Sequence, residues 1–169
     1  KQKTAYEMLR SLVGSEMCIR DRYYPKGHRG VGLARAQGYG AQFNEHYEWQ
    51  KYGPIVIVQI EHIQALDQLE GILSVEGVDG FIIGPYDLSS SMGIPGEFDN
   101  SQFLETIDYI RRVGKELGCP SGIHIVEPDT AKLKESIDLG YRFIAYSVDI
   151  RMLDIAARKG VKVFKEAIS

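Results

Sequence analysis

Two acidic residues stand where two apolar segments of this chain end, and together they could hold a divalent cation. Glu61 closes the largely apolar run 55–60, and Asp87 follows the apolar run 80–83 after a short turn. The two acids are 26 residues apart (61 to 87), about one strand–helix–strand repeat. Ligands of parallel α/β folds bind at the carboxyl ends of strands. Two carboxylates there suit Mg²⁺, which takes oxygen ligands and keeps room for water or substrate oxygens.

The residues around these acids could bind a 2-oxo acid. Gln59 lies two positions before Glu61, so both side chains point to the same face of an extended strand. Its amide could hydrogen-bond a substrate oxygen or a metal-bound water. Residues 84–87 present free backbone N–H groups where a helix would begin, which suits a carboxylate. The cation would then polarise the keto group and stabilise an enolate.

Each of these residues also has an ordinary structural interpretation. Glu61 could mark only the point where a strand reaches water, and Asp87 could be an Asx turn or a helix N-cap. His62 either points away from Glu61 on an extended strand or begins the next helix, and we expect it to have a structural role. His124, inside a strand, is expected to be a core or barrel-lumen histidine with its hydrogen bonds satisfied rather than a ligand. Asp149, at the end of the fourth strand, is weaker evidence of the same kind as the first two acids.

The elements that must position these side chains alternate regularly from residue 54 onward. Strands are predicted at 54–61, 78–83, 121–126 and 141–148, and helices at 63–73, 103–117, 128–139 and 150–168. Residues 84–100 are predicted to be a long loop, and a loop of that length is commonly functional. The strands lack polar alternation, as a parallel sheet requires. Four βα units in series predict an α/β fold, either a flat sheet in three layers or half of a barrel.

Residues 1–53 do not continue this alternation. Residues 23–40 form a glycine-rich basic segment, and 45–51 are predicted to form a short helix. The stretch 11–22 resembles the translation of a sequencing adapter, so we expect residues 1–22 to be non-native and exclude them from the fold. The domain is then expected to span residues 23–169.

Composition excludes several classes of function. The chain of 169 residues has a net charge of −3 and no basic stripe with interleaved aromatic residues, so no nucleic-acid partner is expected. It has no run of about 18 apolar residues, so no membrane span is expected. Cys18 and Cys119 indicate neither a metal pair nor a disulfide scaffold, and we expect a cytoplasmic setting. The length falls short of the roughly 250 residues of an eight-stranded βα barrel.

Several motifs occur in a fixed order between residues 29 and 89. They are Arg29-Gly30-Val31-Gly32 with Ala34-Arg35-Ala36, then Val58-Gln59-Ile60-Glu61, then Val75-Glu76-Gly77-Val78-Asp79-Gly80, and finally Gly84-Pro85-Tyr86-Asp87-Leu88-Ser89. In this order they resemble the HpcH/HpaI family of class II, metal-dependent pyruvate aldolases. The resemblance covers residues 23–169. It implies a TIM (βα)8 barrel of the phosphoenolpyruvate/pyruvate type, and reversible cleavage of a 4-hydroxy-2-oxo acid into pyruvate and an aldehyde.

The resemblance also assigns roles to the candidate site residues. Glu61 and Asp87 match the two protein ligands to Mg²⁺, Mn²⁺ or Co²⁺, and Gln59 matches a glutamine on the substrate side. The backbone from Gly84 and Pro85 to Tyr86 and Asp87 matches the site for the pyruvate carboxylate. Position 86 is often alanine in the family, so the ring of Tyr86 is a departure that bears on the shape of the pocket.

The family's catalytic histidine and enolate-stabilising arginine precede the glycine-rich loop 29–32. We therefore expect this chain to be the C-terminal half of the barrel, with the N-terminal half missing, no catalytic residue of its own and little or no activity alone. The whole protein is expected to be a homo-oligomer.

Two other functions stay open. The first is a carbon–carbon lyase similar to citrate or malyl-CoA lyases, which uses the same metal chemistry; a binding patch for coenzyme A would favour it, and the sequence shows none. The second is a non-catalytic α/β binding module in which both acids are only capping residues.

Overall fold

The computed structural model describes residues 27, 30–52 and 55–168. The elements are η2 (Arg35–Gly40), α2 (Phe43–Tyr52), β1 (Ile57–Ile60), η3 (Ile63–Gln68), α3 (Leu69–Leu73), β2 (Gly80–Ile83), α4 (Pro85–Ser91), α5 (Ser101–Glu116), β3 (Ser121–Ile125), α6 (Thr130–Asp138), β4 (Phe143–Tyr146) and α7 (Asp149–Ile168). The predicted segment 1–22 lies outside the described residues.

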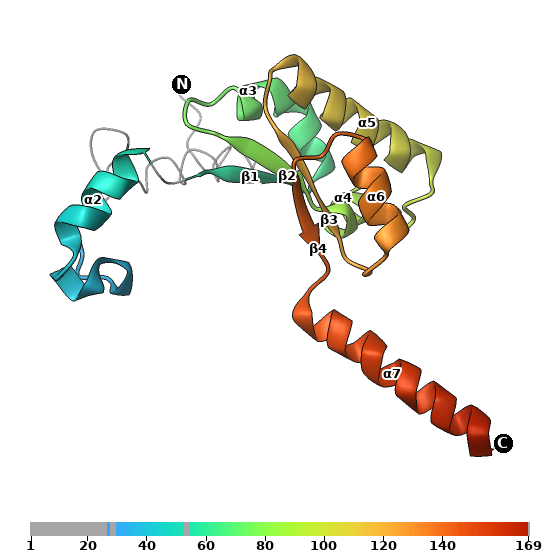
Figure 1. Ribbon diagram of the computed structural model, residues 1–169. Helices are drawn as coiled ribbons and strands as arrows, with labels where there is room; N and C mark the ends of the chain where they lie inside the picture. The colour runs from blue at the N-terminus through green and yellow to red at the C-terminus, as the bar shows by residue number, and fades with distance from the viewer. Residues whose placement is uncertain (1–26, 28–29, 53–54, 169) are drawn as a thin grey trace.

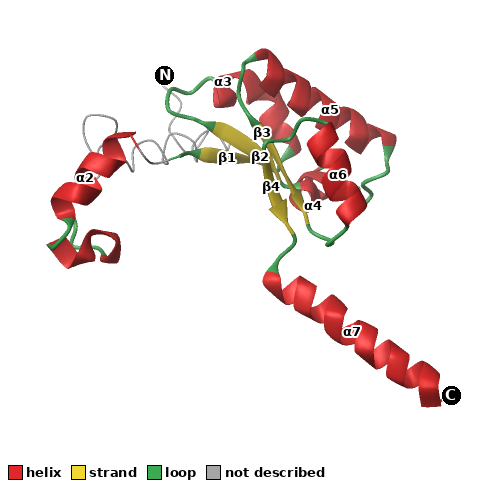
Figure 2. Ribbon diagram, viewed as in Figure 1, coloured by secondary structure: helices red, strands yellow, loops and turns green. Residues whose placement is uncertain are grey.

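The four strands form one parallel sheet in the order β1-β2-β3-β4. Each strand except the first follows a helical connection from its neighbour, as parallel pairing requires. Helices α3, α5 and α6 lie on one side of the sheet (Figures 1 and 2), where α5 contacts β3 and α6 contacts both β3 and β4. The predicted α/β architecture with parallel strands is therefore confirmed.

The core lies between the sheet and these helices. Strand residues that face the helices are buried, and four of them belong to the same apolar cluster as helix residues such as Leu69 and Ile110: Val58, Ile60, Phe81 and Ile83. Residues at the alternate positions point to the opposite face, where Gln59 is exposed and Ile82 and His124 are half-buried. That opposite face is the one that a closed βα barrel turns toward its interior.

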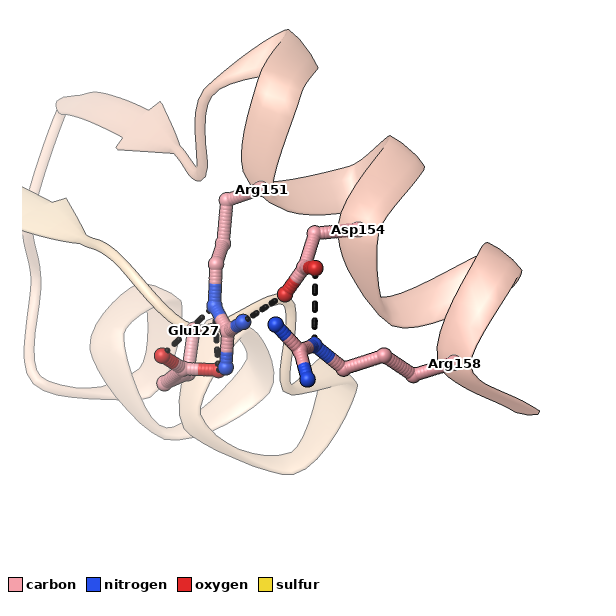
Figure 3. A network of polar contacts seen from close by, with 4 residues as sticks. All are labelled: Glu127, Arg151, Asp154 and Arg158. Carbon is pink, nitrogen blue, oxygen red and sulfur yellow. Dashed lines mark hydrogen bonds and ion pairs between the residues drawn. The ribbon is translucent and has the colours of Figure 1, made fainter. Parts of the chain in front are cut away.

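Helix α7 leaves the sheet at the end of β4 and projects away from it (Figure 1). None of its residues is buried. Arg151, in its first turns, donates to the Glu127 carboxylate after β3 at 2.9 and 2.8 Å, and to Asp154 at 2.6 Å (Figure 3). The hydrogen bond to Glu127 raises the pKa of the Arg151 guanidinium. Polar contacts, rather than buried apolar surface, thus connect this helix to the carboxyl end of the sheet.

The segment 84–100 differs from its prediction as a loop, because it contains α4. Pro85 occupies the first helical position, where its missing N–H costs nothing. Leu88 is fully buried and anchors the helix to the core. The helix was not predicted because a serine-rich sequence is typical of a loop. In the structure the hydroxyls of Ser89 and Ser91 donate hydrogen bonds to the backbone carbonyls of Tyr86 and Leu88, within the helix itself.

The short helix η2 was also not predicted, since it lies in the segment 23–40 expected to be a glycine-rich loop. The remaining elements agree with the predictions within a few residues, and the strands are shorter than expected. The predicted helix 63–73 is divided into η3 and α3, because Gln68 has a non-helical backbone (φ −129°, ψ 18°). Among the described helices, none has the length and apolar composition that crossing a membrane requires.

Tyr141 introduces a pH dependence into the stability of the fold. It lies just before β4, is 3% exposed, and its hydroxyl has no hydrogen-bond partner among the described residues. Burial raises the pKa of Tyr141 to about 12, while Arg111 lowers it and Asp108 raises it by smaller amounts. Above pH 10 the unfolded chain releases this proton and the folded chain keeps it. The raised pKa of Tyr141 therefore lowers the free energy of unfolding by about 3 kcal/mol between pH 10 and pH 12.

We expect Tyr141→Phe to remove that loss and to leave the protein at least as stable at pH 7, since the variant buries no unpaired hydroxyl. Urea unfolding from pH 8 to pH 12 measures the effect. Tyr39→Phe, at an exposed tyrosine, is the matched control. An equal decline in wild type and Tyr141→Phe above pH 10 would show that Tyr141 is not responsible.

Candidate metal and substrate site

The side chains of Gln59 and Glu61 reach over the bare backbone of Gly84 at the carboxyl end of the sheet. Pairing of β1 with β2 continues one residue past the strands, because Gly84 N–H donates to the Ile60 carbonyl at 3.0 Å. A Cβ added to Gly84 would lie 2.8 Å from Gln59 Nε2, 3.1 Å from Glu61 Cβ and 3.5 Å from Glu61 Oε2. A glycine at this position therefore leaves space for the amide and the carboxylate side by side. The structure confirms that Gln59 and Glu61 share a face.

Asp87 comes to the same end of the sheet in the first turn of α4. The N-cap of this helix is Gly84, so the interpretation of Asp87 as an N-cap is wrong. A carboxylate in a first turn is favourable next to the positive end of the helix dipole. The carboxylates of Asp87 and Glu61 have no hydrogen bond or ion pair with any residue in the described part of the chain, and both residues are exposed. Both carboxylates are therefore available to a ligand.

The start of α4 offers backbone donors beside these acids. The N–H groups of the first turn have no carbonyl partner within a helix, and Pro85 has none to offer. This leaves the N–H groups of Tyr86 and Asp87. The Tyr86 ring packs edge-on against Phe98, with ring centroids 4.8 Å apart. The bulky ring at position 86 is thus engaged with the segment that follows α4.

Two serine hydroxyls hold α4 in place. Ser91 Oγ accepts from the Ile63 N–H at 2.8 Å, which ties the end of α4 to the start of η3. Ser89 Oγ accepts from the Gly96 N–H at 3.0 Å and is fully buried. The segment after β1 and the helix after β2 are thereby joined directly, and these two segments carry Glu61 and Asp87.

Other predicted residues have structural roles. His62 is the N-cap of η3, where its Nδ1 accepts from the Gln64 N–H at 3.2 Å, so its predicted structural role is confirmed. Asp149 opens α7, with its carboxylate accepting from the Ile150 N–H at 2.7 Å. Cys18 and Arg29 lie outside the described residues.

Two buried polar groups near the carboxyl end of the sheet were not predicted as functional. His124 Nε2 is buried and has no hydrogen-bond partner in the described part of the chain. Ser147 is buried with an unpartnered hydroxyl and a left-handed backbone (φ 59°), which is unusual for a residue other than glycine. His124 lies inside strand β3 as expected, but the expectation that its ring nitrogens are hydrogen-bonded is wrong for Nε2. A polar residue inside the apolar run 121–126 was the sequence signal that could have identified His124. No sequence signal pointed to Ser147.

The donor set fits a hard divalent cation that keeps open positions. Among residues 27, 30–52 and 55–168, no group of three or more His, Cys, Asp or Glu side chains is placed to hold a metal ion. Two free carboxylates and an amide supply oxygen donors, and Mg²⁺-type ions take one or two protein carboxylates with water or substrate oxygens. Gln59 and Glu61 lie together over Gly84, at the strand end that also leads to Asp87. The residues therefore fit a cation that shares its coordination with a substrate.

Comparisons with known proteins identify the family of the chain. The model of the HpcH/HpaI aldolase/citrate lyase family matches residues 16–155. The hydroxypyruvate/pyruvate aldolase of Roseobacter denitrificans is 40% identical over 144 residues, which are 78% of this chain and 51% of that protein. The 2-keto-3-deoxy-L-rhamnonate aldolase of Escherichia coli (strain K12 / DH10B) is 38% identical over 148 residues, 85% of this chain and 54% of that protein. The chain spans about half the length of these curated relatives.

Solved structures show the same fold. The crystal structure of an HpcH/HpaI aldolase from Desulfitobacterium hafniense DCB-2 aligns with a TM-score of 0.81 at 29% identity, over 94% of this chain and 61% of that one. A family protein from Burkholderia cenocepacia J2315 aligns with a TM-score of 0.81 at 28% identity, over 94% and 63%. The fold is thus TIM-barrel-like rather than a flat sheet in three layers, and the predicted barrel architecture is confirmed.

Gly84→Ala tests the space over Gly84. The new methyl group would displace the Gln59 amide and force Glu61 to shift by a few tenths of an ångström. Alanine tolerates the backbone of Gly84 (φ −96°), so the fold should persist. We expect Mn²⁺ affinity to fall on the order of tenfold, as for other disturbances of residues next to a metal. Calorimetric titration measures this.

Gly71→Ala is the matched control, because nothing lies within 4 Å of a Cβ added there. Equal Mn²⁺ affinity in the two alanine variants would contradict a site over Gly84.

Proposed function

Because the chain belongs to the HpcH/HpaI aldolase/citrate lyase family, we propose that it carries the metal and 2-oxo-acid site of a class II aldolase. The reaction is the reversible cleavage of a 4-hydroxy-2-oxo acid into pyruvate, or a close relative of pyruvate, and an aldehyde. One observation carries the proposal: Gln59 and Glu61 meet over Gly84, three residues before Asp87. The names of the aldolase relatives favour this reaction over that of a citrate lyase.

The proposed roles follow from the chemistry of each group. Glu61 and Asp87 hold Mg²⁺, Mn²⁺ or Co²⁺, and Gln59 hydrogen-bonds a substrate oxygen or a water. When bound, the cation acts as a Lewis acid that polarises the keto group of the substrate. The N–H groups of Tyr86 and Asp87 bind the substrate carboxylate, aided by the positive end of α4. Together these residues orient a 2-oxo acid along the carboxyl end of β1 and β2.

Proton transfer is a separate requirement of aldol cleavage, and we assign it to no described residue. In the family that the motifs resemble, the catalytic histidine and the arginine precede the loop 29–32. The other half of the barrel interior supplies them in this proposal. The chain of 169 residues is then a binding half-site, and cleavage needs the complete barrel.

Removing either carboxylate tests the metal site. We expect Glu61→Gln and Asp87→Asn each to weaken Mn²⁺ binding by on the order of 10–100-fold, because the amide that replaces the carboxylate carries no charge for the cation. Isothermal titration of Mn²⁺ into each variant measures the change. Glu105→Gln, at an exposed acid on α5, is the matched control and should bind as wild type does. If both site variants bind Mn²⁺ as tightly as wild type does, the proposed metal site is wrong. The non-catalytic binding module would then be the better explanation.

Turnover tests the assignment of the acid/base residues elsewhere. With Mg²⁺, pyruvate and a short aldehyde, we expect this chain to form aldol product on the order of 10²–10⁴-fold more slowly than a full-length relative, the contribution typical of general acid–base catalysis. Chromatographic quantification of the product measures the rate. A rate equal to that of the full-length relative would require a proton-transfer residue within this chain.

A further inference from the structure

The first turn of α4 carries Asp87 but lacks the local support that a helix start usually has. Its N-cap, Gly84, has no side chain and makes no capping hydrogen bond. The helix has only seven residues, and a helix of that length is not stable through its own hydrogen bonds. Contacts with other segments of the chain must therefore hold the turn from which the Asp87 carboxylate extends.

Packing holds α4 on both sides of Asp87. On one side Leu88 is fully buried in the core cluster. On the other side the Tyr86 ring lies edge-on against Phe98, with ring centroids 4.8 Å apart and an angle of 87° between the ring planes. Aromatic rings prefer this arrangement to a face-to-face sandwich. Asp87 thus lies between two residues whose side chains are each held by other segments.

The loop after α4 returns along the helix and brings Phe98 to this ring. Gly93 and Gly96 have left-handed backbones (φ 79° and 78°), which glycine adopts readily. The Gly96 N–H donates to the buried Ser89 Oγ at 3.0 Å, and the Phe98 N–H donates to the Gly96 carbonyl at 3.0 Å. A Cβ added to Gly96 would lie 3.9 Å from Tyr86 Cε1. The loop is therefore fixed to α4 at the level of the Tyr86 ring.

Phe98 also connects the Tyr86 ring to the core. Its ring centroid lies 5.4 Å from that of Phe103, which is 4% exposed and belongs to the core cluster. Tyr86 itself is 44% exposed, and its hydroxyl has no hydrogen bond with any residue in the described part of the chain. The contact that holds the first turn of α4 therefore depends on the ring of Tyr86 and not on its hydroxyl.

We propose that Tyr86 is a positioning residue for Asp87: its ring, held by Phe98, fixes the first turn of α4 so that Asp87 can share a divalent cation with Glu61. The proposal rests on the proposed function and adds to it a side chain that does not touch the cation. Groups that are held in place before a ligand arrives bind it more tightly, because less conformational freedom is lost on binding.

Isothermal titration of Mn²⁺ into the whole chain tests the proposal. Tyr86→Ala should weaken binding about tenfold, as for other changes next to a metal ligand. Tyr86→Phe should recover most of that loss, because it keeps the ring. Tyr39→Ala removes the same side chain at an exposed position and should bind as wild type does. Wild-type affinity in Tyr86→Ala, or an equal loss in Tyr86→Phe, would overturn the role of the ring.

Two double variants separate the positioning of Asp87 from a general loss of stability. Tyr86→Ala should weaken Mn²⁺ binding further when it is added to Glu61→Gln, where Asp87 still binds the ion. Added to Asp87→Asn, it should have little further effect, because the two changes act through the same carboxylate. Losses of equal size in both backgrounds would show that Tyr86 does not act through Asp87, and would overturn the proposal.

A further measurement needs no variant to fold. Nuclear Overhauser effects between the ring protons of Tyr86 and Phe98 should be present in wild type before Mg²⁺ is added, and should persist afterwards. Ring contacts that form only with Mg²⁺ would contradict positioning in advance of binding. If wild type binds Mn²⁺ and Tyr86→Ala binds it equally, this inference alone falls. If wild type binds no Mn²⁺, the proposed function falls and this inference falls with it.

Discussion

The parallel register of β1, β2 and β3 is the constraint on which both the core and the candidate site depend. It places Ile60, Ile83 and Ile123 in one row against the helices, and it brings Glu61, Gly84 and His124 into the next row on the other face. Because side chains alternate between the faces of a strand, a slip of one residue would exchange these rows. Glu61 would then point into the apolar cluster, where an unpaired carboxylate is strongly unfavourable. Burial of the isoleucines therefore selects the register that assembles the site.

Each candidate ligand is also adjacent in sequence to a residue that is completely buried. Glu61 follows Ile60, Gly84 follows Ile83, and Asp87 precedes Leu88, and these three apolar residues are 0% exposed. A buried neighbour in a close-packed core fixes the backbone from which the polar side chain extends. The backbone that carries each exposed carboxylate is thus fixed, although neither carboxylate has a polar partner among the described residues. Such carboxylates are suited to bind a cation, since no cationic side chain in the described part of the chain pairs with them.

The sequence predicted this arrangement where a local pattern dictated it. An acidic residue that ends an apolar run marks both the strand and the carboxylate at its end, so Glu61 and its strand were identified together, and Gln59 followed from the two-residue period. Helix α4 was missed because its serines bond to their own helix, which a polar composition does not distinguish from a loop. The hydrogen bonding of His124 and the left-handed backbone of Ser147 depend on what neighbouring strands bring close, and no local pattern encodes that.

Two polar connections flank the row of site residues and hold the segments that leave the sheet beside it. On the β1 and β2 side, Ser91 Oγ accepts from the Ile63 N–H, which joins the segments after those strands. On the β3 and β4 side, Arg151 bonds to Glu127 through two nitrogens (Figure 3), which joins the segments after those strands in turn. An exposed ion pair contributes little to stability, but two parallel hydrogen bonds fix a direction. The second connection therefore matters less for the stability of the sheet than for orienting α7, which follows Ser147.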